Sequence, residues 1–123
     1  MNLKELLPGK CWTICGVQSG RDCQVLTFIY SLPEKDQKQT LALLKFRADT
    51  AIIHNKEKFK KVAEGIFELK TRNNVRILCF WGKHRELILT RGFMKPPNRV
   101  FQQEVKRAQI LLQEYKAKAD KLT

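Results

Sequence analysis

The chain has 123 residues, of which 43% are hydrophobic and 29% charged, and its formal net charge is +12. This length predicts a single domain over residues 1–123. No stretch approaches the roughly 18 consecutive apolar residues of a membrane span, and Met1–Lys10 lacks the apolar run of a secretory signal. The sequence therefore argues against a membrane or secreted protein, and we expect a cytoplasmic location.

The first predicted element is a strand over Lys10–Val17, in which Trp12, Ile14 and Gly16 alternate with two cysteines. Residues 19–21, with a central glycine, are expected to turn the chain after it.

A helical hairpin is expected next. Asp22 is a candidate N-cap for its first helix, although the β-branched residues of 25–30 suit a strand almost as well. The apolar positions follow i, i+3, i+4, i+7 spacing: Val25, Phe28, Ile29 and Leu32. Pro33 ends this helix and precedes a second one over Glu34–Asp49, with Leu41, Leu44 and Ala48 on its inner face. Residues 53–64 show no clear period and are interpreted as a loop.

Three successive antiparallel strands follow, separated by polar turns. The first covers residues 66–70, the second Val75–Trp81 and the third Leu87–Phe93. Residues 72–74 carry two asparagines, which tolerate the left-handed backbone of hairpin turns, and residues 82–85 form the second turn.

The last element is a helix that begins near Asn98, after Pro96 and Pro97. An apolar stripe runs along it: Phe101, Val105, Ala108, Leu112 and Tyr115. The stripe favours core packing, and a heptad seam for dimerisation is the alternative.

These elements predict an α+β fold, with an N-terminal strand and helical hairpin packed on a small antiparallel sheet. The sheet is a three-stranded meander with the C-terminal helix at its side. The predicted core contains Val25, Phe28, Ile29, Leu41, Leu44, Phe67, Leu69, Ile77, Leu87 and Leu89.

The four cysteines, at positions 11, 15, 23 and 79, contain no C-x-x-C pair and are interpreted as small buried hydrophobes. A zinc site or a structural disulfide is the alternative. The sequence has no Gly-rich phosphate loop, no nucleophile elbow and no histidine spacing typical of a metal site. We therefore expect no metal and no cofactor.

Positive charge is concentrated in the second half of the chain. Residues 56–107 carry fourteen Lys and Arg against five acids, whereas residues 1–55 carry seven against five. A basic surface of this kind attracts nucleic acid by releasing counterions. Binding of an acidic protein segment and a merely solvated surface are the alternatives. The residues expected to contact nucleic acid are Lys58, Lys60, Lys61, Arg72, Lys83 and Arg99.

The order of the motifs GIFELKT, RILCFW and GFMK, followed by a long basic helix, resembles the HigB-like, phage-derived branch of the RelE/ParE toxin superfamily. The resemblance runs from about residue 12 to residue 115. It implies the toxin of a type II toxin-antitoxin system, an mRNA interferase that cleaves mRNA on the ribosome without a metal. The implied partners are the ribosome with its mRNA and a neutralising antitoxin, usually a helix-turn-helix protein.

The resemblance also implies site residues. Arg76 would hold the scissile phosphate with a forked guanidinium, and Lys70 and Lys95 would lie beside it. His84, Arg91 and Arg99 are candidates for the general acid. The chain has Pro96 where the family has a second motif lysine, Arg91 where a histidine is frequent, and Glu68 where the best-studied branch has lysine. Each cation has a solvated surface residue as its alternative.

Two other functions stay open. One is a non-enzymatic nucleic-acid-binding or phage-derived regulatory protein on the same fold, and the other is a gyrase-inhibiting toxin, because a fold does not fix a function. His54 and His84 both lie in predicted loops, so a ribonuclease with a histidine pair is not expected.

Overall fold

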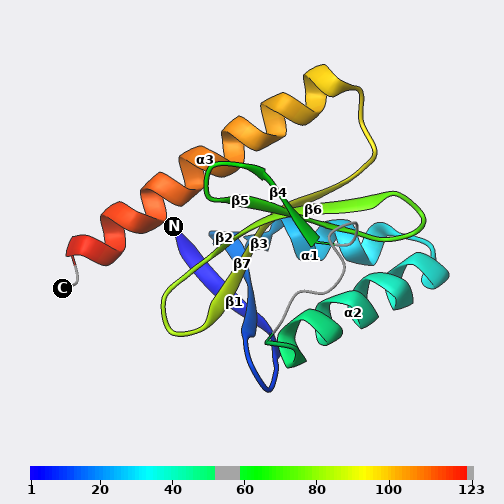
Figure 1. Cartoon of the computed structure of the whole chain (residues 1–123), viewed down its shortest axis with the longest axis horizontal. Helices are drawn as coiled ribbons and strands as arrows, with labels where there is room; N and C mark the ends of the chain where they lie inside the picture. The colour runs from blue at the N-terminus through cyan, green and yellow to red at the C-terminus, as the bar shows by residue number, and fades with distance from the viewer. Residues whose placement is uncertain (52–58, 122–123) are drawn as a thin grey trace.

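The computed structural model describes residues 1–51 and 59–121, and it has the α+β character that the sequence predicts (Figure 1). The strands are β1 (Asn2–Pro8), β2 (Thr13–Ser19), β3 (Asp22–Cys23), β4 (Phe59–Ala63), β5 (Ile66–Lys70), β6 (Val75–Trp81) and β7 (Glu86–Met94). The helices are α1 (Gln24–Ser31), α2 (Glu34–Asp49) and α3 (Asn98–Lys121).

The strands form a seven-stranded mixed sheet in the order β1-β2-β7-β6-β5-β4, and β3 pairs with β2. Strands β5, β6 and β7 pair antiparallel, whereas β2 pairs with β7 in parallel, from Thr13 opposite Glu86 to Gly16 opposite Leu89. The predicted three-stranded sheet is therefore too small, because its strands lie inside a larger sheet.

Two of the additional strands have irregular sequence patterns. In β1 the register shifts between Glu5 and Leu7, and in β4 it shifts between Lys61 and Ala63. A bulge places consecutive residues on one face and breaks the period of two by which a strand is recognised. The prediction of a loop over residues 53–64 is wrong for β4, and residues 52–58 lie outside the described part of the chain.

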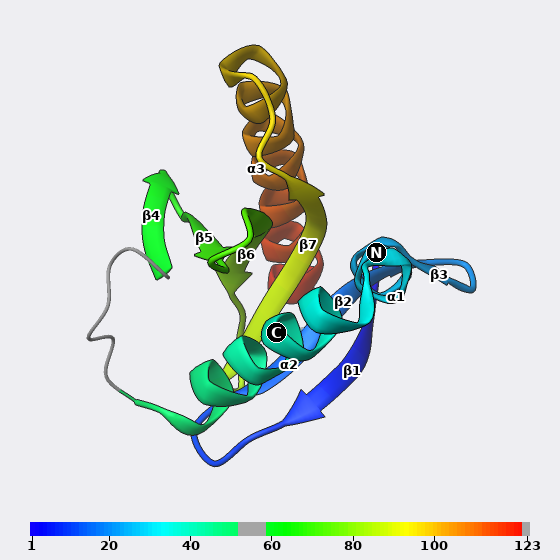
Figure 2. The ribbon, with the colours of Figure 1, turned by 90° about the vertical axis from the view of Figure 1, so that its right-hand side faces the viewer.

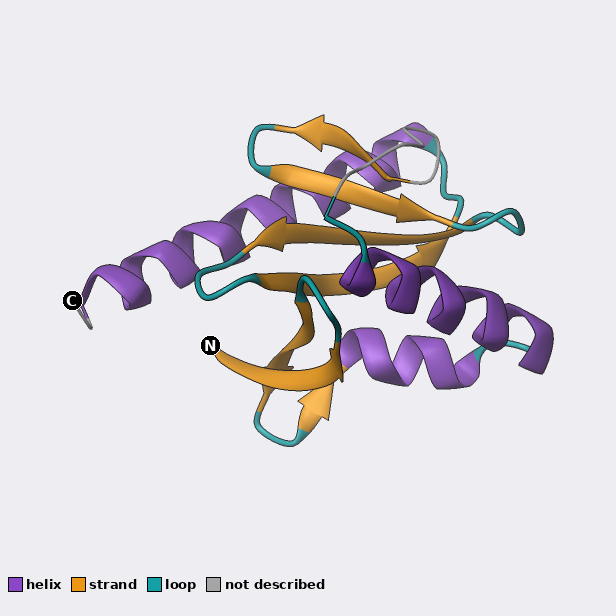
Figure 3. Cartoon of the chain, turned by 60° about the horizontal axis from the view of Figure 1, so that its bottom comes forward, coloured by secondary structure: helices purple, strands orange, loops and turns teal. Residues whose placement is uncertain are grey.

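Helices cover both faces of the sheet, with α1 and α2 on one side and α3 on the other (Figure 2 and Figure 3). The core under α1 and α2 contains nine of the ten residues predicted for it, of which Phe28 and Phe67 are partly buried. Leu41 is the exception, because its position on α2 leaves it 45% exposed. A second core lies under α3 and is formed by Cys15, Ile66, Leu78, Phe80, Ile88, Val105, Ala108 and Leu112.

The helical hairpin forms as predicted, with one correction at its start. Residues 24–31 are helical, so the alternative of a strand there is excluded, and α2 has the predicted bounds. The N-cap of α1 is Cys23 and not Asp22, because Asp22 pairs with Ser19 in the short strand β3. Leu32 ends α1 by donating its backbone N–H to the carbonyl oxygen of Ile29 at 3.1 Å.

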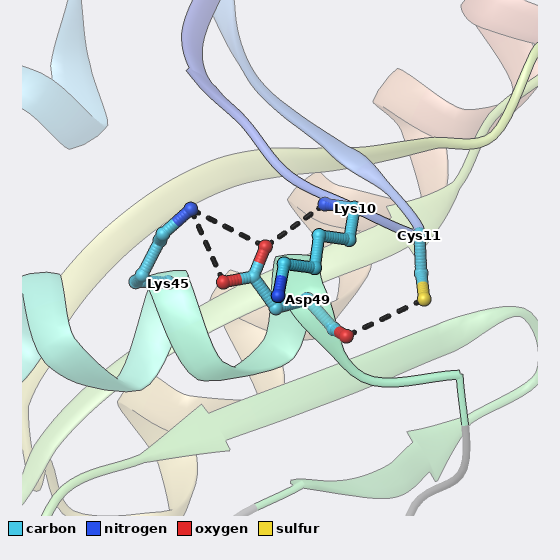
Figure 4. Close-up of polar contacts among 4 residues, drawn as sticks. All are labelled: Lys10, Cys11, Lys45 and Asp49. Atoms are coloured by element: carbon cyan, nitrogen blue, oxygen red, sulfur yellow. Dashed lines mark hydrogen bonds and ion pairs between the residues drawn. The ribbon is translucent and has the colours of Figure 1, made fainter.

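The loop between β1 and β2 is fastened to the end of α2 (Figure 4). The backbone N–H of Lys10 donates to Asp49 Oδ1 at 2.8 Å, and Lys45 Nζ lies 3.1 Å from Asp49 Oδ2. Cys11 Sγ donates to the Asp49 carbonyl oxygen at 3.4 Å. The hydrogen bond from Lys10, followed by that from Lys45, lowers the pKa of Asp49 below its ordinary value of 3.8. These contacts join the N-terminal hairpin to the helical layer.

The cysteines are unbridged, and three of them, Cys15, Cys23 and Cys79, are buried. Among the described residues, no group of three or more His, Cys, Asp or Glu is arranged to hold a metal ion. None of the described helices is both long enough and apolar enough to span a membrane.

A matched pair of substitutions on α3 tests how much the second core contributes to stability. Leu112 is 6% exposed and Ile110 is 61% exposed. We expect Leu112→Ala to lower the free energy of unfolding by about 2–5 kcal/mol, since it leaves a cavity under the helix. Ile110→Ala should change it by less than about 0.5 kcal/mol. Equal effects in urea unfolding would mean that α3 does not pack through this face.

The contacts of Asp49 predict that the stability of the fold depends on pH. The pKa of Asp49 in the folded state lies below its ordinary value, so the carboxylate stabilises the fold fully at any pH above the ordinary value. This stabilisation is lost as the pH falls through the lowered pKa. Asp49→Asn should therefore lower the melting temperature at neutral pH, and the difference from wild type should shrink in acid. Asp22→Asn, at an exposed carboxylate, is the control. A difference that is independent of pH would contradict this reading.

Candidate functional site

A pocket of about 380 Å³ opens at the end of the sheet where β6 begins, on the face covered by α3. Its walls come from β4, β6, the connection between β7 and α3, and the first turns of α3. The residues that line it are Lys60, Lys61, Val62, Arg76, Lys95, Pro96, Asn98 and Phe101. We call it the cationic pocket.

Lys95 is held beside the start of β6 by the backbone. Its N–H donates to the carbonyl oxygen of Asn74, in the turn between β5 and β6, at 3.1 Å. Pro96 and Pro97 follow directly and cannot extend the ladder, because proline has no backbone N–H. The connection therefore leaves the sheet at this point, with Lys95 next to Arg76.

The first turns of α3 form the opposite wall of the cationic pocket. The rings of Phe93 on β7 and Phe101 on α3 pack edge to face, with centroids 6.2 Å apart. This contact holds the N-terminal end of α3 over the sheet, and Asn98 lines the pocket there. Unpaired N–H groups and the positive end of the helix dipole lie at such an end, so it favours an anion.

Arg76 is fixed by a carboxylate beneath it. Arg76 Nη1 lies 3.2 Å from Glu68 Oε2 and 3.4 Å from Oε1, and the side chain of Glu68 is fully buried while that of Arg76 is 12% exposed. An ionised carboxylate is tolerated in the interior when a cation pairs with it. The pair therefore sets the position of the guanidinium in the pocket wall.

The same pair limits how Arg76 can contact a ligand. Its Nε is buried and has no hydrogen-bond partner among the described residues, and its Nη1 faces Glu68. Nη2 is the nitrogen left for an anion. The forked contact predicted for Arg76 is thus not available in this arrangement, and a phosphate would need a second cation such as Lys95.

The cationic pocket has a strongly positive lining. Four of its residues are cations, at positions 60, 61, 76 and 95, and no carboxylate is among the described lining residues. Lys61 Nζ lies 3.2 Å from Glu64 Oε2, but both side chains are more than half exposed. Such a surface ion pair is worth little in water. The pocket therefore suits a phosphate.

Two predicted catalytic residues lie near the cationic pocket without lining it. Lys70 is the cross-strand neighbour of Arg76, yet it lines a different groove beside α2. Arg91 lies on β7 with its Nη1 3.7 Å from Glu104 Oε1 of α3. Arg91 therefore pairs with α3 and does not line the cationic pocket.

The expectation that His84 could be the general acid beside Arg76 is wrong. Arg76 begins β6, whereas His84 follows the other end of that strand, about 17 Å away at roughly 3.3 Å per residue. His84 lines a separate pocket together with Lys83 and Tyr115. An imidazole at that distance cannot serve as general acid in the cationic pocket.

The remaining predicted nucleic-acid contacts are divided between the two ends of the sheet. Arg72, in the turn between β5 and β6, and Arg99, in the first turn of α3, are exposed at the end that holds the cationic pocket. Lys83 is exposed at the opposite end, beyond β6. Lys58 lies outside the described residues.

Sequence reasoning missed the structural role of Glu68 and the contribution of Asn98. A usable signal existed for Glu68, because it is an acid inside the apolar run 66–69 and faces the strand that carries Arg76. The position of Asn98 depends on how α3 crosses the sheet, which a local pattern does not encode.

Removing Arg76 should lower the stability of the fold. Arg76→Ala leaves the charge of Glu68 buried and unpaired, so we expect the free energy of unfolding to fall by about 3–5 kcal/mol. The double variant Glu68→Gln/Arg76→Ala should recover part of this loss, because the buried group is then neutral. Arg99→Ala is the exposed control. If Arg76→Ala is as stable as Arg99→Ala in urea unfolding, the ion pair does not fix the guanidinium.

Comparison with known proteins confirms the phage-derived character in the resemblance and does not reach the HigB branch itself. Residues 27–113 match the family described as "Phage derived protein Gp49-like (DUF891)", a match that covers well over half of the chain and includes Glu68, Arg76 and Lys95. A search of curated proteins finds no match. The chain therefore belongs to the Gp49-like family of phage-derived proteins, a toxin family of the RelE/HigB type.

Proposed function

We propose that this chain is the toxin of a type II toxin-antitoxin system, of the HigB kind, and that it cleaves mRNA on the ribosome in the cytoplasm. Membership of the Gp49-like family supports a toxin. The observation that carries the proposed activity is the cationic pocket, in which Arg76 and Lys95 line one cavity beside the N-terminal end of α3.

The proposed reaction needs no metal. The 2′-oxygen of a ribose attacks the adjacent phosphorus, the new P–O bond closes a cyclic phosphate, and the bond to the 5′-oxygen of the next nucleotide breaks. Negative charge grows on the phosphate oxygens along this path, and fixed cations stabilise it because they need no reorganisation. Arg76 Nη2 and Lys95 Nζ would contact those oxygens, and Lys60 would lie beside the neighbouring backbone.

The proton transfers explain why the ribosome is part of the proposal. The 2′-hydroxyl gives its proton to a water molecule, and the leaving 5′-oxygen takes one from the general acid. Glu68 is fully buried and paired with Arg76, so it cannot reach the ribose in this structure. Arg99, exposed on the first turn of α3, is the remaining acid candidate. With so few groups, the reaction depends on an mRNA that is already ordered, as it is in the decoding site.

A second function, binding without cleavage, is favoured by two observations. Arg76 uses Nη1 for Glu68, and no imidazole is among the described residues around the pocket. The same cations would then hold an RNA backbone without cutting it. Cleavage assays separate these two functions directly.

The proposal includes a cognate antitoxin, expected to be a helix-turn-helix protein encoded beside this chain. Its co-expression should restore growth that the toxin stops.

The test is cleavage of a defined mRNA by the purified chain, with and without ribosomes. We expect cleavage when ribosomes are present, and no effect of a chelator. Lys95→Ala should lower the cleavage rate about 10²-fold, because it removes a cation that acts on the transition state. Arg76→Lys should lower it similarly while keeping a positive charge near Glu68, since one ammonium cannot pair with Glu68 and reach the phosphate as Nη1 and Nη2 of the guanidinium would.

Lys116→Ala is the control, because Lys116 is an exposed cation near the far end of α3. Ribosome binding by sedimentation should be nearly the same for all three variants. Efficient cleavage of RNA in the absence of ribosomes would rule out the ribosome-dependent mechanism. Binding to ribosomes without any cleavage would support the second function.

A further inference from the structure

A second groove, of about 520 Å³, lies at the same end of the sheet but on the opposite face, beside α2. It is lined by Gln39, Ala42, Leu43 and Phe46 of α2 and by Lys70, Thr71 and Arg72 at the end of β5. We call it the α2 groove.

The helix wall of the α2 groove carries one amide and three apolar residues, Ala42, Leu43 and Phe46, of which Leu43 also packs partly against the core. Its four residues follow i, i+3, i+4, i+7 spacing, which places them on one face of α2. The inward face of α2 is a different one, where Leu44 and Ala48 are buried. Phe46 is 59% exposed, and a large aromatic beside a groove is typical of a docking site.

The rim of the α2 groove is positive. Its two charged lining residues, Lys70 and Arg72, are both cations. The nearby carboxylate of Asp36 already accepts a hydrogen bond from Asn73 Nδ2 at 2.6 Å. A ligand for this groove must therefore combine apolar side chains with negative charge.

We infer that the α2 groove binds an amphipathic, acidic helical segment of the antitoxin. Apolar side chains of that segment lie against Phe46 and Leu43, and its carboxylates face Lys70 and Arg72, as in other grooves that accept a helix. The apolar helix wall and the net charge of +12 favour such a protein segment. The inference rests on the proposed function, which supplies the antitoxin as the partner.

The location of the α2 groove defines how the antitoxin acts. Lys70 is the cross-strand neighbour of Arg76, and the turn that carries Arg72 also holds Lys95 through the carbonyl of Asn74. An antitoxin segment bound in the α2 groove lies at the same end of the sheet as the cationic pocket, but on the other face. It blocks entry of this end of the toxin into the ribosome without contacting Arg76.

The test uses the full chain and the product of the neighbouring gene, with growth rescue measured first and the dissociation constant second. Phe46→Ser is compared with Ile110→Ser, because Ile110 on α3 is 61% exposed and thus matches Phe46 in exposure. We expect Phe46→Ser to raise the dissociation constant about 30-fold, as for an interface anchor, and to weaken rescue. Ile110→Ser and Lys95→Ala should each change the dissociation constant less than about 3-fold.

The outcomes are distinguishable. If the neighbouring protein neither binds nor rescues the wild type, the proposed function fails and this inference fails with it. If it binds and rescues, but Phe46→Ser behaves like Ile110→Ser, the groove assignment alone is wrong. Phe46→Ser that keeps antitoxin binding but loses affinity for ribosomes would make the groove an RNA contact and overturn the inference. Circular dichroism verifies that both serine variants fold.

Discussion

The structure depends on the burial of β7 on both of its faces. Leu87, Ile88 and Leu89 are all fully buried, and their side chains alternate between the two cores. A strand of this kind is stable when helices cover both sides of its sheet. Because β7 pairs with β2 on one side and β6 on the other, it joins the N-terminal hairpin to the basic half of the chain. It also leads directly into Lys95 and α3, so the same strand positions the cationic pocket.

The cationic pocket combines exposed lysines with one arginine whose position is fixed. Lys60, Lys61 and Lys95 are exposed and keep much of their freedom, whereas Arg76 is held by the buried Glu68. A buried ion pair contributes little net stability, because desolvation offsets the attraction. Its better attested effect is to specify one arrangement, and here that arrangement holds Arg76 in the wall of a pocket without carboxylates in its described lining. Under the proposed function, the lysines would attract the RNA backbone, and Arg76 would already be in place to bind it.

Local patterns in the sequence were enough to predict α2, the three strands of the meander and their turns. The left-handed backbone of Asn74, with φ of 67°, is what its turn requires. The parallel pairing of β2 with β7 is non-local, and the bulged strands β1 and β4 lack a clear period, so these features were missed. The error over His84 was avoidable, because the predicted bounds of β6 already separate it from Arg76 by a whole strand. To predict that Glu68 pairs with Arg76, the register between β5 and β6 must be known. The length of the turn between these strands is only a weak guide to that register.

The central claim is that the cationic pocket receives the scissile phosphate of mRNA. The most direct measurement is a structure of the chain on a ribosome that carries an mRNA with a 2′-O-methyl group at the cleavage site, which blocks attack. We expect the phosphate that follows this ribose within hydrogen-bond distance of Arg76 Nη2 and Lys95 Nζ. An mRNA that contacts the toxin elsewhere, with no phosphate in the pocket, would contradict the account.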